Sequence, residues 1–191
     1  MMRIITGRAK GIKLETLKGD NTRPTAERTK EAVFSMLQFD IEGREVLDLY
    51  AGSGQMGLEA VSRGAASATL VDKSKDAVSV IQKNIDKTRL GESCRVFCSD
   101  AVDYIRTVKS RRKFDIVFID PPYALRAVPQ TLAALVNSDL LKVGALVVCE
   151  SEEADVLENS PDLSKKFEVV KRAKYGVANI TILTPIRENN G

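Results

Sequence analysis

The sequence predicts an α/β fold, in which helices cover both faces of a mostly parallel sheet that contains one antiparallel strand. Three observations carry this prediction. From residue 44 onward, short apolar runs typical of buried strands alternate with stretches of helical spacing, the pattern of a parallel sheet with right-handed crossovers. A glycine-rich turn at residues 51–54 follows the first of these runs directly. Two strand-like runs, at residues 167–173 and 177–183, flank Lys174-Tyr175-Gly176 and predict a terminal hairpin.

The elements are expected in a regular order. Near the start, residues 3–6 and 12–17 predict two short strands around two glycines with a basic tip, and a helix follows that Thr25 is suited to cap. The main body begins after residue 40, so we expect a basic extension over residues 1–40 and one larger domain over residues 41–191. Its strands are expected near 45–50, 67–72, 94–98, 114–120 and 144–150, and its helices near 55–63, 74–88, 100–109, 125–137 and 151–159.

Composition restricts the class of protein. The chain has 191 residues, of which 43% are hydrophobic and 29% charged, and no apolar run approaches the ~20 residues of a membrane span. The three cysteines, Cys94, Cys98 and Cys149, are odd in number and widely spaced, which argues against a disulfide framework and for the reducing cytoplasm. We interpret Cys94 and Cys98 as core thiols, because too few further ligands accompany them for a zinc site. No metal is expected.

The chain contains no histidine. This excludes Ser-His-Asp and Cys-His nucleophiles, histidine-ligated metals and imidazole acid–base chemistry. Any catalysis must depend on carboxylates, backbone groups, positioning and a reactive cofactor.

Positive charge is concentrated near the N-terminus. Residues 1–30 hold eight basic and three acidic side chains, a net charge of +5, whereas the rest of the chain has a net charge of −2. A basic arm on a slightly acidic body indicates a polyanionic partner, and Arg8, Lys10 and Lys13 are candidate contacts to RNA. The alternative is a solvated, flexible N-terminus without a partner.

The turn after the first strand is a candidate cofactor site. Its glycines allow the backbone to approach a ligand closely, and Gly57 completes the spacing of a dinucleotide fingerprint, so a dehydrogenase has to be considered. Asp48 argues against that alternative, because a carboxylate at the strand end would repel a pyrophosphate and suit a cationic ligand. The candidate cofactor-binding residues of this turn are Asp48, Tyr50, Ala51, Gly52, Ser53 and Gly54.

Carboxylates also end the next strands. Asp72, followed by Lys73, lies about twenty residues past the glycines, where an acidic residue can accept both hydroxyls of a ribose. Asp100, followed by Ala101, is placed to contact an adenine edge. Each carboxylate alone is more often a helix cap or a surface residue. Acidic residues at the ends of four successive strands, the fourth being Asp120, predict a pocket for S-adenosylmethionine.

The fourth strand runs into Asp120-Pro121-Pro122-Tyr123. Two prolines cannot continue a sheet, so the chain must turn outward at the strand's carboxyl end, where open α/β sheets bind ligands. Asp120 and the Pro121 carbonyl offer two acceptors to a planar amine, and Tyr123 offers a stacking surface for a nucleobase, which must be unpaired or flipped to reach it. We take Asp120, Pro121, Pro122 and Tyr123 as candidate catalytic residues. The alternative is that this turn only connects the strand to the following loop and has no function.

Along nearly its whole length the chain resembles the bacterial family that methylates the N2 amine of a guanine in 16S rRNA. The resemblance is carried by short motifs, of which Thr22-Arg23-Pro24-Thr25 is the most specific, since amino-methyltransferases that act on DNA share the Asp-Pro-Pro-Tyr turn. The other matching pieces are Arg3-Ile4-Ile5-x-Gly7, Asp48-Leu49-Tyr50-Ala51-Gly52-Ser53-Gly54, Gly57-Leu58-Glu59-Ala60, Ser62-Arg63-Gly64-Ala65 and Tyr175-Gly176.

The resemblance implies a seven-stranded class I S-adenosylmethionine-dependent methyltransferase with an N-terminal hairpin that contacts RNA. It also implies that Arg23, Pro24 and Thr25 line the active site, and that the substrate is an assembled or late-assembling small ribosomal subunit. A monomer is expected, since the enzyme must approach a very large substrate. The alternatives are a DNA amino-methyltransferase, for which the chain has no room for a target-recognition insertion, and a non-catalytic RNA-binding assembly factor.

Overall fold

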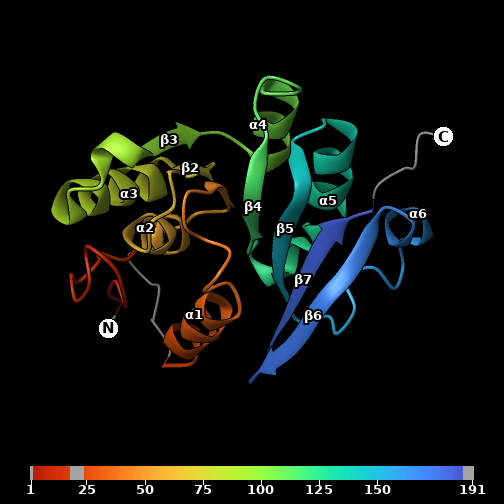
Figure 1. Cartoon of the computed structure of the whole chain (residues 1–191), viewed down its shortest axis with the longest axis horizontal. Helices are drawn as coiled ribbons and strands as arrows, with labels where there is room; N and C mark the ends of the chain where they lie inside the picture. Colours follow the sequence, from red (N-terminus) through yellow and green to blue (C-terminus); the bar gives the residue numbers. More distant parts are fainter. Residues whose placement is uncertain (1, 18–23, 187–191) are drawn as a thin grey trace. The chain divides into compact units, whose positions relative to one another are not determined.

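The computed structural model describes residues 2–17 and 24–186, except the side chains of residues 24–26. The chain forms two compact units, unit 1 (Met1–Ala101) and unit 2 (Val102–Gly191) (Figure 1). The expected partition at residue 40 stays a prediction.

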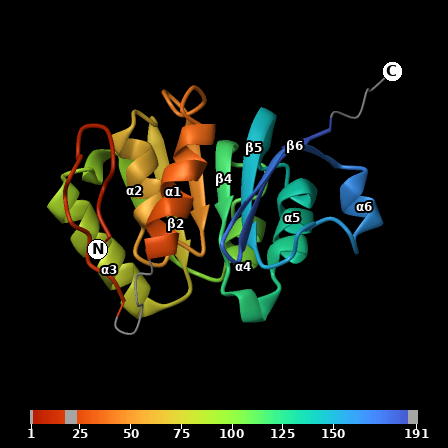
Figure 2. The same ribbon diagram turned by 90° about the horizontal axis from the view of Figure 1, so that it is seen from below.

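Unit 1 contains three parallel strands in the order β3-β2-β1, so the chain moves outward strand by strand from the first. Val46, Leu47 and Leu49 of the first strand are fully buried, and α2 and α3 pack against the strands, with the N-terminal segment beside these helices (Figure 2). The elements of unit 1 are α1 (Pro24–Met36), β1 (Glu45–Leu49), α2 (Gln55–Ser62), β2 (Ser67–Asp72), α3 (Lys75–Thr88), the 3-10 helix η1 (Gly91–Ser93) and β3 (Cys94–Cys98).

The N-terminal segment, residues 2–17, is docked on α2. Gly7 lies so close to the end of that helix that a Cβ atom added there would stand 1.8 Å from the Ser62 carbonyl oxygen. Ser62 also accepts a backbone hydrogen bond from Arg8 (2.9 Å) and, through its hydroxyl, one from Ala9 (3.0 Å). With Ile4 fully buried as well, the segment is a fixed part of unit 1, and its interpretation as a flexible tail is wrong over these residues.

A buried carboxylate explains why this segment does not form the expected two strands. Glu59 of α2 is fully buried, and its two oxygens accept the backbone N–H groups of Ile5 (2.7 Å) and Thr6 (3.0 Å). Those groups are therefore not available to extend the pairing of the two stretches. That pairing consists of the bridge between Arg3 and Lys13 and of backbone hydrogen bonds such as those from Ile4 to Ile12 and from Leu14 to Met2, each 3.0 Å long. Buried carboxylates require such partners, because burial without them is costly.

Two cations complete the environment of Glu59. Arg63 lies 2.8 Å from one carboxylate oxygen, and Lys30 lies 3.7 Å from the other. Burial lowers the pKa of Lys30, and the nearby Glu59 carboxylate opposes that shift. The guanidinium of Arg63 stands over the ring of Phe34, 4.8 Å from its centre, so α1, α2 and the N-terminal segment share one buried ionic contact.

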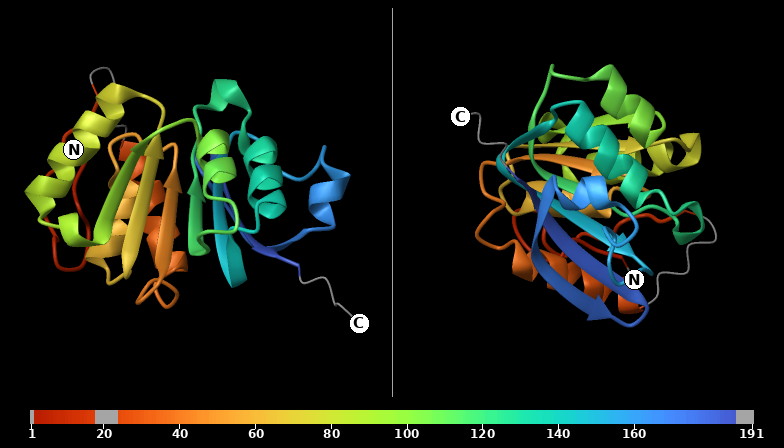
Figure 3. Two further views of the ribbon diagram at one scale, coloured as in Figure 1. Left: turned by 90° about the horizontal axis from the view of Figure 1, so that it is seen from above. Right: turned by 90° about the vertical axis from the view of Figure 1, so that its right-hand side faces the viewer.

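Unit 2 contains four strands in the order β4-β5-β7-β6, of which β4 and β5 are parallel and β7 is antiparallel to both of its neighbours. The long hairpin of β6 and β7 is visible in the right-hand view of Figure 3. The elements of unit 2 are α4 (Ala101–Thr107, whose first residue closes unit 1), β4 (Phe114–Ile119), the 3-10 helix η2 (Tyr123–Leu125), α5 (Val128–Asn137), β5 (Leu141–Ser151), α6 (Pro161–Ser164), β6 (Phe167–Tyr175) and β7 (Ala178–Pro185).

The expected fold class is confirmed as a mixed, mostly parallel α/β sheet of seven strands. One predicted helix is wrong: residues 151–159 form turns. Ser151 still pairs with Asn179 in the sheet, and Asp155 caps the N–H of Leu157 (2.9 Å) and binds Arg172 (2.7 Å), so tertiary contacts override local helix propensity.

The expectation of two core thiols in β3 is also wrong in part. Cys98 is exposed and Cys94 half-buried, because β3 is the outer strand of unit 1 and has a single neighbour, β2. Burial raises the pKa of Cys94 to about 12.

Candidate functional site

The turn after β1 is built from residues in the left-handed region. Tyr50, Gly52 and Gly54 have φ angles of 62°, 56° and 79°. The turn is held by the backbone N–H of Ala51, which donates to the Val71 carbonyl at 3.0 Å, and by that of Gly54, which donates to Ala51 at 2.7 Å. A Cβ added at Gly52 would meet no described atom within 4 Å, so the turn presents bare backbone to open space.

Asp48, one strand residue before the turn, is buried and engaged by α2. Its Oδ2 accepts the backbone N–H of Gly57 at 2.8 Å. A Cβ added at Gly57 would lie 3.3 Å from that oxygen and 3.0 Å from the Leu70 side chain, so glycine allows the close approach. The contact holds a carboxylate beside the first turn of α2, where it would repel a diphosphate, and it disfavours the dehydrogenase alternative.

Burial raises the pKa of Asp48 to about 7, the Gly57 hydrogen bond opposes the shift, and the charge of Asp72 adds to it. A cation bound beside Asp48 would favour its ionised form.

Asp72, at the end of β2, closes the same turn. Its two oxygens accept the backbone N–H groups of Gly52 and Ser74, each at 2.9 Å. An ionised carboxylate has about four acceptor positions, so about two remain for the hydroxyls of a ribose. Lys73 is exposed next to it.

The end of β3 joins this edge of unit 1. Ser99 donates its backbone N–H to the Asp72 carbonyl at 3.0 Å, so Asp100, two residues past the end of β3, follows directly on a residue bound to the end of β2. Asp100 is exposed, and Ala101 is buried at the start of α4. The structure therefore brings three of the four predicted carboxylates to the carboxyl ends of β1, β2 and β3.

Ser53 ties the turn to the N-terminal segment. Its side chain is buried, and its carbonyl accepts a hydrogen bond from Asn84 of α3 at 2.9 Å. The same amide receives the backbone N–H of Glu15 at 2.7 Å and donates to the Glu15 carbonyl at 3.0 Å. Asn84, which the sequence analysis did not single out, thus fixes the turn and residue 15 together.

The second predicted turn lies in unit 2, after β4. Asp120 is exposed, Pro121 buried, Pro122 exposed and Tyr123 half-buried. The turn closes through η2, where the Pro122 carbonyl accepts the backbone N–H of Leu125 at 2.9 Å. Pro121 and Pro122 carry no N–H, so this stretch of backbone presents carbonyl acceptors.

Glu150 is the functional candidate that the sequence analysis missed. It ends the apolar run of β5, whose Cys149 pairs with Ile119 of β4, and its Oε1 accepts the hydroxyl of Tyr123 at 3.0 Å. Burial raises the pKa of Glu150 and also that of Tyr123, which the Glu150 carboxylate raises further. The available signal was an acidic residue at the end of a buried strand, the same signal that identified Asp48, Asp72 and Asp120.

The structure describes some, but not all, of the residues that were predicted to contact RNA. Arg8, Lys10 and Lys13 are all exposed on the docked N-terminal segment, and Arg8 donates to the Ser93 hydroxyl at 3.3 Å. Arg23 lies outside the described residues. Pro24 and Thr25 are the first two residues of α1, so Thr25 lies inside the helix and the expectation that it caps the helix is wrong. The side chains of both residues lie outside the described part of the chain.

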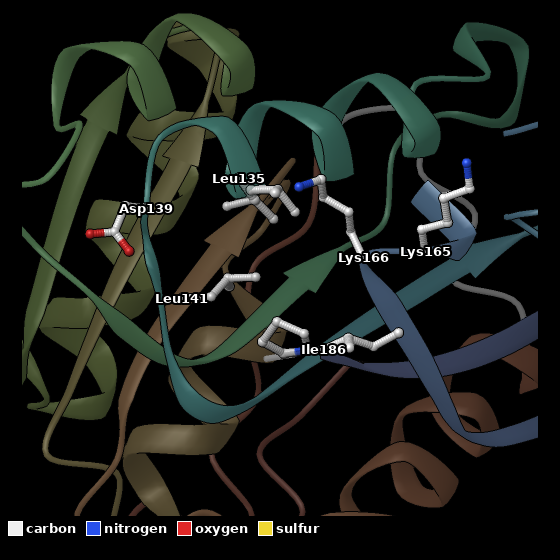
Figure 4. A pocket seen from close by; sticks show the side chains of 8 residues that line it. Leu135, Asp139, Leu141, Lys165, Lys166 and Ile186 are labelled. Carbon is white, nitrogen blue, oxygen red and sulfur yellow. The ribbon is translucent and has the colours of Figure 1, made fainter. Parts of the chain in front are cut away.

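A pocket of about 300 Å³ lies elsewhere in unit 2, among α5, the start of β5, α6 and the end of β7 (Figure 4). Leu135, Leu141 and Ile186 form its apolar part, with Lys165 and Lys166 at its border, and it contains no predicted site residue. Among residues 2–17 and 24–186, no helix is long and apolar enough to cross a membrane. The same residues contain no cluster of three or more acidic or cysteine side chains able to hold a metal.

The chain is similar to known proteins over most of its length. The family model described as Conserved hypothetical protein 95 matches residues 2–184. Ribosomal RNA small subunit methyltransferase D of Haemophilus influenzae is 34% identical over 153 residues, which cover 80% of this chain and 79% of that protein. The protein of the same name from Escherichia coli K12 is 34% identical over 160 residues, covering 84% of this chain and 79% of its own length.

A solved structure of yhhF from Escherichia coli superposes with a TM-score of 0.83 at 29% identity, over 98% of this chain and 99% of that one. The family model spans residues 2–184 and therefore includes both turns. This chain therefore belongs to the Conserved hypothetical protein 95 family, together with the proteins named ribosomal RNA small subunit methyltransferase D.

Proposed function

We propose that this chain transfers a methyl group from S-adenosylmethionine to the exocyclic N2 amine of one guanine in the 16S rRNA of the small ribosomal subunit. Membership of the family makes it an rRNA methyltransferase, and the choice of guanine N2 is the proposal. The observation that carries it is the turn at residues 120–123, which presents a carboxylate, carbonyl acceptors and a fixed aromatic ring at the end of a buried strand.

The donor set of unit 1 fits S-adenosylmethionine. Asp72 would hold the ribose, Asp100 and Ala101 the adenine edge, and the open backbone at Gly52 the body of the cofactor, with Asp48 near its cationic end. The further predicted contacts are Tyr50, Ala51, Ser53, Gly54 and Lys73. When bound, the cofactor supplies an electrophilic methyl group, whose bond to sulfur breaks as the lone pair of the amine nitrogen forms the new C–N bond.

The residues of the turn prepare the amine for attack. Its lone pair is delocalised into the purine ring, so Asp120 and the Pro121 carbonyl, accepting one N–H each, would favour a pyramidal nitrogen. They would also stabilise the positive charge that develops on that nitrogen. One N–H proton must leave after transfer, and the Asp120 carboxylate is the group that would receive it and pass it to water. Tyr123, held by Glu150, would stack on the base.

The docked N-terminal segment would bind the RNA backbone. Because Arg8, Lys10 and Lys13 are exposed on a segment fixed to α2, they form a rigid basic surface. The role of Arg23, Pro24 and Thr25 in lining the active site stays a prediction from the family resemblance.

Charge removal tests this surface. Changing Arg8, Lys10 and Lys13 together to Gln is expected to reduce the log–log salt slope of rRNA binding by about 2–3. The matched control changes exposed Lys165, Lys166 and Lys171 of unit 2 to Gln and should leave the slope near that of the parent. A parental slope in the first variant would show that the segment does not contact RNA.

The direct test is transfer of labelled methyl from S-adenosylmethionine to small ribosomal subunits that lack base methylation. Naked rRNA and duplex DNA are assayed in parallel, and the labelled nucleoside is identified. Label in N2-methylguanosine on subunits, and none on DNA, is the expected result. Label in DNA would favour a DNA amino-methyltransferase, and tight cofactor binding without transfer to any RNA would favour a non-catalytic assembly factor. The monomeric state and the cytoplasmic location stay predictions.

A further inference from the structure

A small pocket in unit 2 adjoins the turn at residues 120–123. Its volume is about 200 Å³, below the ~300–1,000 Å³ typical of sites for larger ligands, and it is suited to a single planar base. Pro121 and the Tyr123 ring form one part of its wall. The polar part of the wall contains one guanidinium, from Arg126, and the carboxylates of Glu150, Glu152 and Glu153.

Glu150 is the carboxylate whose position is fixed. It follows Cys149, which pairs with Ile119, so Glu150, one residue before the end of β5, has the same position in the register as Asp120, which directly follows the neighbouring β4. The Tyr123 hydroxyl binds one of its oxygens at 3.0 Å. Since an ionised carboxylate offers about four acceptor positions, this bond leaves acceptor capacity at a group that lines the pocket.

The hydrogen-bonding edges of the purines differ in a way that such an acceptor can read. Guanine presents two donors side by side, N1–H and the N2 amine, whereas adenine presents an acceptor at N1. A carboxylate facing N1 therefore attracts guanine and repels adenine. Asp120 and Glu150 each follow one of the paired residues Ile119 and Cys149, so their carboxylates would serve as the acceptors for the two neighbouring donors of guanine.

We propose that Glu150 accepts the N1–H of the target guanine and so selects guanine over other purines at this site. The inference rests on the proposed function and adds the residue that determines its specificity. A hydrogen bond from N1–H to a carboxylate also increases electron density in the ring, which makes the N2 nitrogen a better nucleophile. Arg126 would balance the charge by binding a phosphate of the same nucleotide.

The test replaces the target guanine with a base that lacks the N1–H donor. 2-Aminopurine keeps the exocyclic amine of guanine but has an acceptor at N1. Small subunits are rebuilt with rRNA that carries 2-aminopurine in place of the guanine that the parent enzyme methylates, and kcat/KM is compared for both bases. The parent is expected to prefer guanine by about 10- to 100-fold, the range of discrimination for a specific base contact. Equal rates on the two bases would overturn the inference.

Glu150→Gln is the diagnostic variant. Its amide group can donate to the N1 of 2-aminopurine, so the preference for guanine should shrink toward unity. Tyr123→Phe removes the hydroxyl but keeps Glu150, so it should lower both rates and keep the preference. Glu168→Gln on β6 makes the same charge change outside the site and should leave rates and preference unchanged.

The outcomes separate the two levels of the proposal. If Glu150→Gln folds, binds S-adenosylmethionine as the parent does and keeps the parental preference, then Glu150 only positions Tyr123 and the inference is wrong. If the parent transfers no methyl to guanine N2 in any subunit, the proposed function fails, and the inference fails with it.

Discussion

The two turns of this protein follow buried strands in the same way but present opposite chemistry. The turn after β1 uses glycines and left-handed residues, and its backbone N–H groups are bound by carbonyls or, at Gly52, by the Asp72 carboxylate. The turn after β4 uses two prolines, which have no N–H, and its aromatic ring is fixed by a side chain, Glu150. The turn after β1 is a rigid backbone frame beside carboxylates, which suits it to binding a cofactor. The turn after β4 presents carboxylate and carbonyl oxygens that can accept hydrogen bonds, which suits it to binding an amine.

The largest effect is expected at the turn of unit 2. Asp120→Ala should lower single-turnover methyl transfer by about 10²–10³-fold, the size of effect seen when one preorganised group at a developing charge is removed. Cofactor affinity measured by calorimetry should change by less than about twofold, since binding of S-adenosylmethionine is assigned to unit 1. Asp162→Ala, at an exposed position of α6, is the control. Loss of cofactor affinity in Asp120→Ala would contradict the assignment of cofactor binding to the turn after β1 and of amine binding to the turn after β4.

At Asp72 we expect the opposite result, a large effect on cofactor affinity and a small effect on turnover. Asp72→Ala removes a carboxylate that holds the N–H groups of Gly52 and Ser74, and hydrogen bonds to a charged group contribute about 1.5–3 kcal/mol. Calorimetry should show affinity for S-adenosylmethionine weakened by about ten- to a hundredfold, with turnover at saturating cofactor much less affected. Asp76→Ala, an exposed change in the first turn of α3, should bind as the parent does. Unaltered affinity in Asp72→Ala would rule out its proposed role.

A substitution at Gly57 tests whether the backbone beside the turn after β1 requires a glycine. Gly57→Ala would place a Cβ 3.0 Å from the Leu70 side chain and 3.3 Å from Asp48, and overpacking of this kind costs about 1–3 kcal/mol of stability. Chemical denaturation measures that loss, and cofactor affinity should fall with it. Gly91→Ala is the control, because its Cβ would meet Ile85 at an ordinary 3.6 Å. If both variants are equally stable, the close approach at Gly57 is not required.

The smallest effect on cofactor affinity is a pH dependence. Burial raises the pKa of Asp48 from 3.8 to about 7, so the folded chain binds this proton more tightly than the unfolded chain between those values. Stability should therefore fall as pH rises from about 4 to 7 and level off above, while affinity for cationic S-adenosylmethionine should rise several-fold between pH 6 and 8. Asp48→Asn should flatten both profiles, and an unchanged affinity profile would show that Asp48 does not sense the cofactor's charge.

Much of this protein could be predicted from local pattern. Apolar runs located the core strands, the glycines located the turn after β1, and the prolines located the end of β4, because chain geometry at these residues leaves few alternatives. The helix expected over 151–159 failed since Ser151 pairs with Asn179, a contact between residues distant in the sequence. The expected N-terminal strands are shortened to one bridge and its flanking hydrogen bonds for the same reason, since Glu59 takes the N–H groups of Ile5 and Thr6.

The sequence by itself thus determined the fold class, the two turns and the acidic strand ends, because each depends on residues adjacent in the chain. Only the tertiary structure decided which partners those residues have. It paired Asp48 with Gly57, gave both oxygens of Asp72 to backbone N–H groups, docked the basic segment on α2 and placed Glu150 against Tyr123. Hydrogen bonds and burial join residues by position in space, and spacing along the chain does not encode that position.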